Sequence, residues 1–197
     1  MLNLKSVYLY FLAIKIIIIK FIKKIYFTTN FYNRSLNTIT PKKIFFFPNP
    51  FLLSSLTNYR NFSFKLSKID PDTFWDNSNS LKDVQILNKF LWLNLIDRKN
   101  DIEIIKKIIS NWIKKNNKYK KIIWSNSVLS NRVISWIINS DIILGKPDEE
   151  FKTNFFNSII IQINHLKKNV KFEDNFEIKI EILSAILLTG LVFKEYS

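Results

Sequence analysis

The segment LKDVQILNKFLWLNL, residues 81–95, sets the fold class of this chain of 197 residues. Its apolar side chains recur at three- and four-residue steps, which is the spacing of one face of an α-helix. These side chains are Val84, Leu87, Phe90, Leu91 and Leu95. The turn-rich DNSNS at residues 76–80 comes directly before them and supplies candidates for the helix N-cap. We therefore expect a helix that begins near residue 80.

Further segments toward the C-terminus show the same helical period. They are residues 102–112, 128–137, 151–166 and 178–191. Residues 116–121 (NNKYKK) form a loop, and Gly145 with Pro147 should close the helix before them in the chain. The polar connections between these helices are short, which favours antiparallel αα-hairpins. The predicted fold class of residues 80–197 is therefore all-α.

The first 79 residues differ from the rest in both pattern and charge. Residues 1–29 are strongly apolar and interrupted by lysines, whereas residues 30–79 contain helix-breaking prolines. Alternation at 62–66 is typical of an extended segment. Residues 1–69 carry eleven Lys or Arg and no Asp or Glu, so most of the net charge of +14 lies there. We expect a basic amphipathic helix over 1–29, an irregular segment over 30–79 and a helical part over 80–197.

Residues 1–29 leave three interpretations open. The longest run without a charge is 6–14, which is short for a membrane-spanning helix. Most lysines follow the apolar run, whereas those of a signal peptide precede it. A helix that packs on the protein or lies on a membrane surface is favoured over a poor membrane anchor or a targeting segment, and we expect a buried first helix. Attachment to a membrane or another anionic surface through this segment is the alternative function of the chain.

The composition excludes several classes of site. Cysteine is absent and His165 is the single histidine, so thiolate and multi-imidazole metal sites are excluded. The two glycines are too few for a phosphate-binding loop. Four Arg stand against twenty-six Lys, whereas proteins that read nucleic acids depend on arginine. We expect no cofactor, no metal and no nucleic-acid partner.

Between residues 74 and 193 the helical part also carries motifs in a fixed order. They are Trp75, NKFLWLNL at 88–95, Trp112 with Asn116, Trp124, Arg132 with Trp136, Phe151 with Ser158, Gln162 and Leu166, and Ala185 with Leu187 and Gly190. This series resembles the N-terminal helical domain of the heparinase II/III-like superfamily. The opening segment is similar to the leader helices of its bacterial branch. The chain departs from the family pattern at Lys89 and at Glu177.

The resemblance implies part of an (α/α) toroid from a polysaccharide lyase. Such enzymes cleave uronic-acid glycans by β-elimination, in which a base removes a proton and an acid protonates the leaving oxygen. The resemblance implies an acidic polysaccharide as partner. The compartment stays open from the sequence, with the cell envelope or the cytoplasmic face of the membrane expected over secretion. Because family members are longer, we expect an incomplete toroid, inactive alone, whose missing C-terminal portion leaves an apolar edge exposed near residues 183–193.

No catalytic residue is expected in this chain. The resemblance implies Tyr, His, Asn and Arg for the chemistry. His165 lies on an apolar helix and is expected to be structural or on the surface. Tyr119 falls in a lysine-rich loop, and Tyr196 is expected at a frayed terminus.

Arg132, Trp136 and Trp124 are the candidate substrate-binding residues. Arg132 lies four residues before Trp136, so both occupy one helix face. Arg132 could bind a sugar carboxylate through two parallel hydrogen bonds, with either tryptophan stacked on a sugar ring. The competing interpretation is a buried Arg132 paired with Asp97 or Asp141, with the tryptophans in the core.

Overall fold

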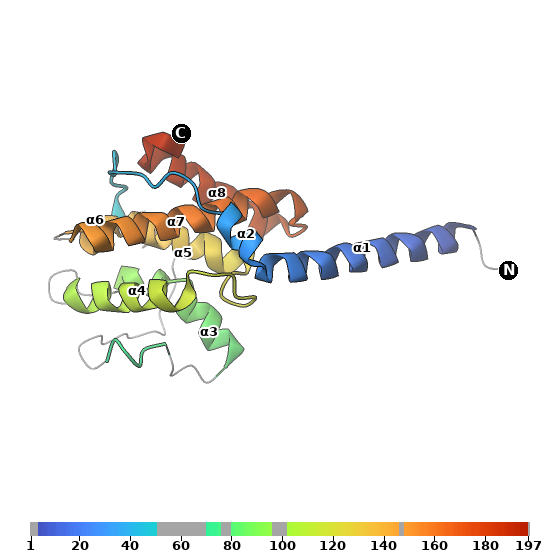
Figure 1. Ribbon diagram of the computed structural model, residues 1–197, viewed down its shortest axis with the longest axis horizontal. Helices are drawn as coiled ribbons and strands as arrows, with labels where there is room; N and C mark the ends of the chain where they lie inside the picture. Colours follow the sequence, from blue (N-terminus) through green and yellow to red (C-terminus); the bar gives the residue numbers. More distant parts are fainter. Residues whose placement is uncertain (1–3, 51–69, 76–79, 96–101, 146–147, 197) are drawn as a thin grey trace. The chain divides into compact units, whose positions relative to one another are not determined.

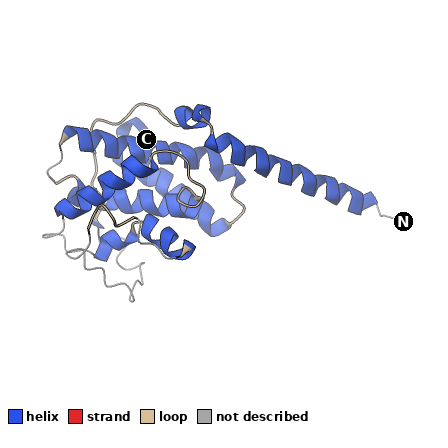
Figure 2. Ribbon diagram, turned by 60° about the horizontal axis from the view of Figure 1, so that its bottom comes forward, coloured by secondary structure: helices blue, strands red, loops and turns tan. Residues whose placement is uncertain are grey.

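The computed structural model describes residues 4–50, 70–75, 80–95, 102–145 and 148–196. Within these ranges the chain is helical and contains no strand, so the predicted all-α class is confirmed for them (Figure 2). The extended segment expected at 62–66 lies outside the described residues. The chain divides into two compact units, Met1–Ser35 and Leu36–Ser197. Residues 30–35, which we expected to be irregular, form a short helix.

The unit Met1–Ser35 contains helix α1 (Leu4–Thr28) and helix α2 (Asn30–Ser35). Thr29 separates them, and its hydroxyl accepts a hydrogen bond from the Tyr32 N–H at 3.1 Å. Tyr32 is buried against the rings of Tyr26 and Phe27, with ring centroids 4.9 and 4.7 Å away. None of the α1 side chains that the structure describes is buried, so the expectation of a buried first helix is wrong for them. Among the described residues, no helix has the length and apolar content needed to cross a membrane.

The unit Leu36–Ser197 holds the remaining helices (Figure 1). Its α-helices are α3 (Leu81–Asn88), α4 (Ile102–Asn116), α5 (Asn126–Ile138), α6 (Ser140–Ile143), α7 (Glu149–Asn169) and α8 (Phe176–Val192). Its 3₁₀ turns are η3 (Leu91–Leu95), η4 (Val170–Phe172) and η5 (Lys194–Tyr196). Helix α5 is central, because it packs against α3, α7, α8 and η3.

Three helices of this unit begin at a capping side chain, as the sequence pattern predicts for α3. The Ser80 hydroxyl accepts from the Asp83 N–H at 3.1 Å, and Asn175 Oδ1 accepts from the Ile178 N–H at 3.0 Å. Asp148 caps α7 in the same way through the Phe151 N–H. Each cap satisfies a backbone donor that has no partner within its helix, which stabilises a helix start by about 1 kcal/mol.

The helix expected over residues 84–95 is instead broken at Phe90. Phe90 has a φ of +58°, a left-handed conformation that costs a bulky residue roughly 1–3 kcal/mol. The break turns its ring fully into the core and directs its carbonyl to the Ser135 hydroxyl, which donates at 2.7 Å. The ring lies 5.1–5.9 Å, centroid to centroid, from Trp75, Trp92, Trp112 and Trp136. Burial among four indoles offsets the backbone strain.

Helix α8 presents two different faces. Its buried side contains Ile182, Ala185, Thr189 and Val192. The opposite side exposes apolar residues at four- and three-residue steps, and we call them the α8 stripe: Phe176, Ile180, Leu183, Leu187 and Leu191. The apolar edge expected near residues 183–193 is therefore present at the three leucines, whereas Phe193 itself is fully buried.

Candidate functional site

The three predicted substrate-binding residues lie in the core. Arg132 and Trp136 project from α5 and are 0% exposed, and Trp124 is 2% exposed in the turn before it. None of them offers a surface to a sugar in this structure. Their placement is the one that the competing interpretation required, with both tryptophans as packing residues.

The partners of Arg132 differ from the carboxylates that we expected. Its Nε donates to Gln162 Oε1 at 2.6 Å, and its Nη1 donates to the carbonyls of Asn88 and Ile123 at 2.9 and 3.1 Å. Asp97 lies outside the described residues, and the oxygens that accept from Arg132 in the described part of the chain are neutral. The guanidinium also lies over the Trp112 ring, with Cζ 4.2 Å from the centroid. Burial lowers the pKa of Arg132 well below its usual value.

Several residues of the ordered motif series meet around this guanidinium. Trp112 Nε1 donates to Asn88 Oδ1 at 2.6 Å, and Gln162 Nε2 donates to the Ser158 carbonyl at 3.0 Å. We call this group the Arg132 cluster: Asn88, Trp112, Arg132, Trp136, Ser158 and Gln162. Its members come from α3, α4, α5 and α7, so the cluster joins these helices through buried hydrogen bonds. Buried polar groups that are satisfied in this way favour one packing arrangement over others.

Two nitrogen atoms of the Arg132 cluster are exceptions to this hydrogen bonding. Arg132 Nη2 and Trp136 Nε1 are buried and have no hydrogen-bond partner among the described residues. The Trp136 ring nevertheless packs edge-on against Phe90 and Trp112, with centroids 5.1 and 5.3 Å away. The apolar contacts of this ring therefore hold it in place without its N–H.

His165 is a core residue rather than a surface residue. It is 2% exposed on α7, and its ring stacks on Tyr119 with centroids 5.7 Å apart and meets the Trp124 ring edge-on at 5.5 Å. Burial lowers its pKa to about 3, and the positive charges of Arg132 and Lys168 act in the same direction. The imidazole is therefore neutral at physiological pH and suited to packing.

Tyr119 and Tyr196 are both held more firmly than the sequence suggested. Tyr119 lies in the expected loop but is half-buried, and this burial raises the pKa of its hydroxyl. The Tyr196 hydroxyl donates to the Ile39 carbonyl at 2.8 Å and lies 2.6 Å from the Thr38 hydroxyl. The expected frayed terminus is therefore wrong for Tyr196, which fastens the C-terminal turn to residues 38–39.

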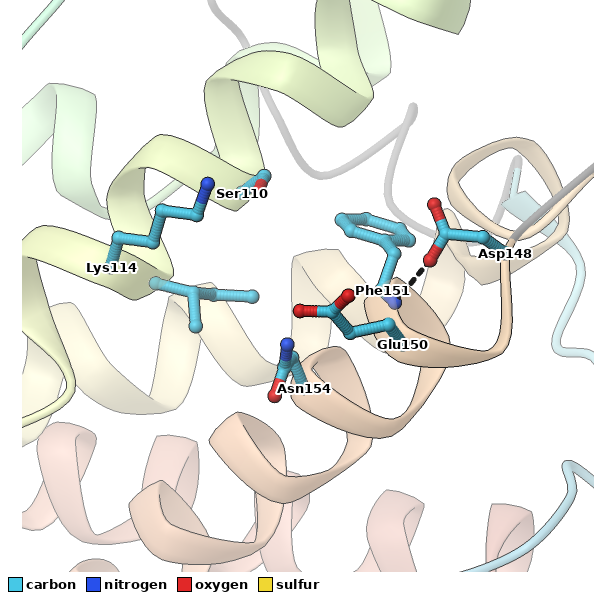
Figure 3. A pocket seen from close by; sticks show the side chains of 7 residues that line it. Ser110, Lys114, Asp148, Glu150, Phe151 and Asn154 are labelled. Carbon is cyan, nitrogen blue, oxygen red and sulfur yellow. Dashed lines mark hydrogen bonds between the residues drawn. The ribbon is translucent and has the colours of Figure 1, made fainter.

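A surface cleft of about 200 Å³ lies between α4 and the start of α7. Figure 3 shows Ser110 and Lys114 of α4 on one side, facing Glu150, Phe151 and Asn154 of α7. The lining contains one cation, carboxylates, an amide and one aromatic ring. Its cation, carboxylates and amide can form hydrogen bonds with a hydroxylated ligand. The lining contains no histidine or tyrosine that could exchange protons with such a ligand near neutral pH.

The sequence offered no signal for this cleft. Its lining residues lie in two stretches of the chain, 110–114 and 148–154, that are separated by more than thirty positions. Within the described ranges, no three metal-ligating side chains come together either. The structure thus brings together one buried polar cluster and one open polar cleft.

No family model, curated protein or solved structure matches this chain.

Proposed function

We propose that this chain is a scaffold portion of a heparinase II/III-like polysaccharide lyase. In this proposal its helices form antiparallel αα-hairpins of an incomplete (α/α) toroid that acts on an acidic, uronic-acid-containing glycan by β-elimination. The single observation that carries the proposal is the exposed α8 stripe.

The α8 stripe has the properties of a surface made to be covered. Leu183, Leu187 and Leu191 are 51%, 67% and 59% exposed, and they lie on one face of α8, opposite the face that packs on α5. Helical arrays bury such faces against the next helix pair. Soluble monomers rarely expose a continuous apolar patch of this kind without a partner. A further helix pair of the toroid is the partner that the proposal assigns to it.

The Arg132 cluster supports the same assignment. The motif residues that resemble the family come from four stretches of sequence, and they converge on one guanidinium. Residues that are typical of a fold family are expected to contact one another in the core when their role is to stabilise that fold. The motifs are therefore interpreted as marks of the scaffold, and the proposal gives Arg132, Trp136 and Trp124 no contact with the substrate.

The proposal assigns no catalytic residue to this chain. β-Elimination needs a base, an acid and a group that neutralises the sugar carboxylate. Among the described side chains, His165 is buried and neutral, and Tyr119 is partly buried against it. The base and the acid are therefore expected on polypeptide that packs against the α8 stripe.

The test begins with the nucleotide sequence that follows the Ser197 codon. We expect it to encode helices and a set of Tyr, His and Asn residues, in the same frame or a separate one. The assembled protein should release unsaturated uronate from a uronic-acid polymer, measured by ultraviolet absorbance. The triple variant Leu183→Asn, Leu187→Asn, Leu191→Asn should lower this activity at least about tenfold, since three apolar contacts are lost.

The matched control is Ile14→Asn, Ile18→Asn, Phe21→Asn on α1, whose residues are 52%, 51% and 62% exposed. This control should leave the lyase activity unchanged. The proposal is wrong if the downstream sequence encodes no such residues, if the α8 variant is as active as the control, or if this chain alone depolymerises the glycan.

A further inference from the structure

Helix α1 exposes many apolar side chains that the proposed function does not use. Exposed apolar residues occur on several sides of α1, and one set of them follows four- and three-residue steps without a lysine. We call this set the α1 stripe: Val7, Phe11, Ile14, Ile18, Phe21 and Ile25. At about 100° per residue these positions form one continuous face along the helix. A helix of 25 residues is about 37 Å long.

The charge of the same helix has a single sign. Five lysines occur in α1, at positions 5, 15, 20, 23 and 24, and all fall outside the α1 stripe. Arg34 adds a sixth positive charge, and no Asp or Glu precedes Asp70 in the sequence. A charge-free apolar face bordered by lysines is the pattern of helices that lie in the plane of a membrane surface.

We propose that α1 binds the surface of an anionic lipid bilayer, with the α1 stripe inserted among the acyl chains and its lysines at the headgroups. Lying in the plane of the surface keeps Lys15, near the middle of the helix, at headgroup level. Charge complementarity selects this occupant, because each basic residue near an anionic surface strengthens binding about fivefold. Tyr8 and Tyr10 near one end and Tyr26 near the other have the amphipathic rings that settle at headgroup depth.

A second copy of the chain fits the α1 stripe less well. The stripe also has the spacing of a coiled-coil seam. Pairing two copies of α1 would bring lysines together without any carboxylate from this unit, since residues 1–35 contain none. Like charges at a helix interface destabilise it, whereas anionic lipid neutralises them.

The experiment is co-sedimentation of the full chain with vesicles of phosphatidylcholine containing about one-third phosphatidylserine. We expect binding that weakens as salt rises and that falls at least about tenfold on vesicles of phosphatidylcholine alone. The α1 triple variant Ile14→Asn, Ile18→Asn, Phe21→Asn should lose at least about tenfold in affinity. Lys15→Gln should lose about fivefold.

The matched control is the α8 triple variant, which removes three leucines of similar exposure and should bind vesicles like the unmodified chain. Tryptophan fluorescence shows whether the unit Leu36–Ser197 is folded in each variant, and far-ultraviolet circular dichroism shows whether the helical content is retained. Undiminished vesicle binding by the α1 variant, equal loss in both triple variants or equal binding to both vesicle types would overturn the proposal. A chain that ignores vesicles but forms a dimer that the α1 variant dissociates would show that a second copy is the occupant. Because these readouts do not involve glycan cleavage, they are independent of the proposed lyase role.

Discussion

Helices α1 and α5 are both rich in isoleucine, yet they lie in opposite environments. Nine of the thirteen residues of α5 are buried, whereas none of the described side chains of α1 is. Helix α5 carries one charged residue, Arg132, and α1 carries five lysines. The apolar content of a helix therefore does not decide whether the helix is buried.

Helices α1 and α5 differ in the partners of their charged side chains. The guanidinium of Arg132 meets oxygens of Gln162, Asn88 and Ile123, which belong to different parts of the fold. A charge is buried at acceptable cost only where such partners are in place. The lysines of α1 would each need comparable partners to enter a protein core. At a membrane surface the headgroups and water supply those partners instead.

The largest expected effect comes from removing the buried cation. Arg132→Ala should lower the free energy of unfolding by about 4 kcal/mol, because buried acceptors lose their donor and a cavity opens over Trp112. Urea denaturation followed by tryptophan fluorescence measures this, since all five tryptophans belong to the unit Leu36–Ser197. Lys15→Ala on α1 is the matched control and should change the value by less than about 0.5 kcal/mol. Equal effects of the two substitutions would remove the contrast between the helices.

A smaller effect is expected from one isoleucine in each helix. Ile137→Ala on α5 should cost about 3 kcal/mol, because Ile137 is 1% exposed and its removal leaves a cavity. Ile18→Ala on α1 should cost less than about 0.5 kcal/mol in the same measurement. If Ile18→Ala proved as destabilising as Ile137→Ala, α1 would be packed within the protein in solution, and its lipid-facing role would be excluded.

The smallest effect is a pH dependence that arises beside α5 and has no counterpart in α1, which contains no Asp, Glu or His. The His165 pKa is about 3 in the folded chain against an ordinary 6.5. Between these values the unfolded chain binds more protons, so stability falls as the pH drops, by up to about 1.4 kcal/mol per pH unit. Denaturation at several values from pH 7 to pH 5 should show this slope.

The substitution His165→Gln is the control for that slope. His165→Gln should reduce the change in the free energy of unfolding between pH 6.5 and pH 5. This range lies above the one in which ordinary carboxyl groups titrate. A slope that persists in His165→Gln would assign the pH dependence to another group and would contradict the neutral, buried state of this imidazole.

Much of the helical part was predictable because the period of apolar residues is a local property. The expected helices at 102–112, 128–137, 151–166 and 178–191 all correspond to observed helices. The exposed edge of α8 was also expected, although Phe193 is buried. The break at Phe90 was not predictable, because its helical spacing is intact and the indoles of Trp75, Trp112 and Trp136, from other segments, pack on the Phe90 ring.

The site residues were harder to assign than the helices. Arg132 and the tryptophans form a conspicuous pattern, and the same pattern suits either a sugar site or a core. The structure buries all three residues, and burial depends on which helices pack together. The cleft between α4 and α7 had no sequence signal, because its polar residues are ordinary for helix ends and solvent-facing positions.

The amino-acid sequence by itself determined the helical class, the N-cap of α3 and the basic, apolar character of α1, because each depends on neighbours within a few positions. The tertiary structure alone decided which oxygens receive the Arg132 guanidinium, why Phe90 leaves the helix and which apolar stripes stay exposed. Those outcomes depend on contacts between segments far apart in the chain, and a hydrogen bond or a buried ring has its energy only when its partner is in place.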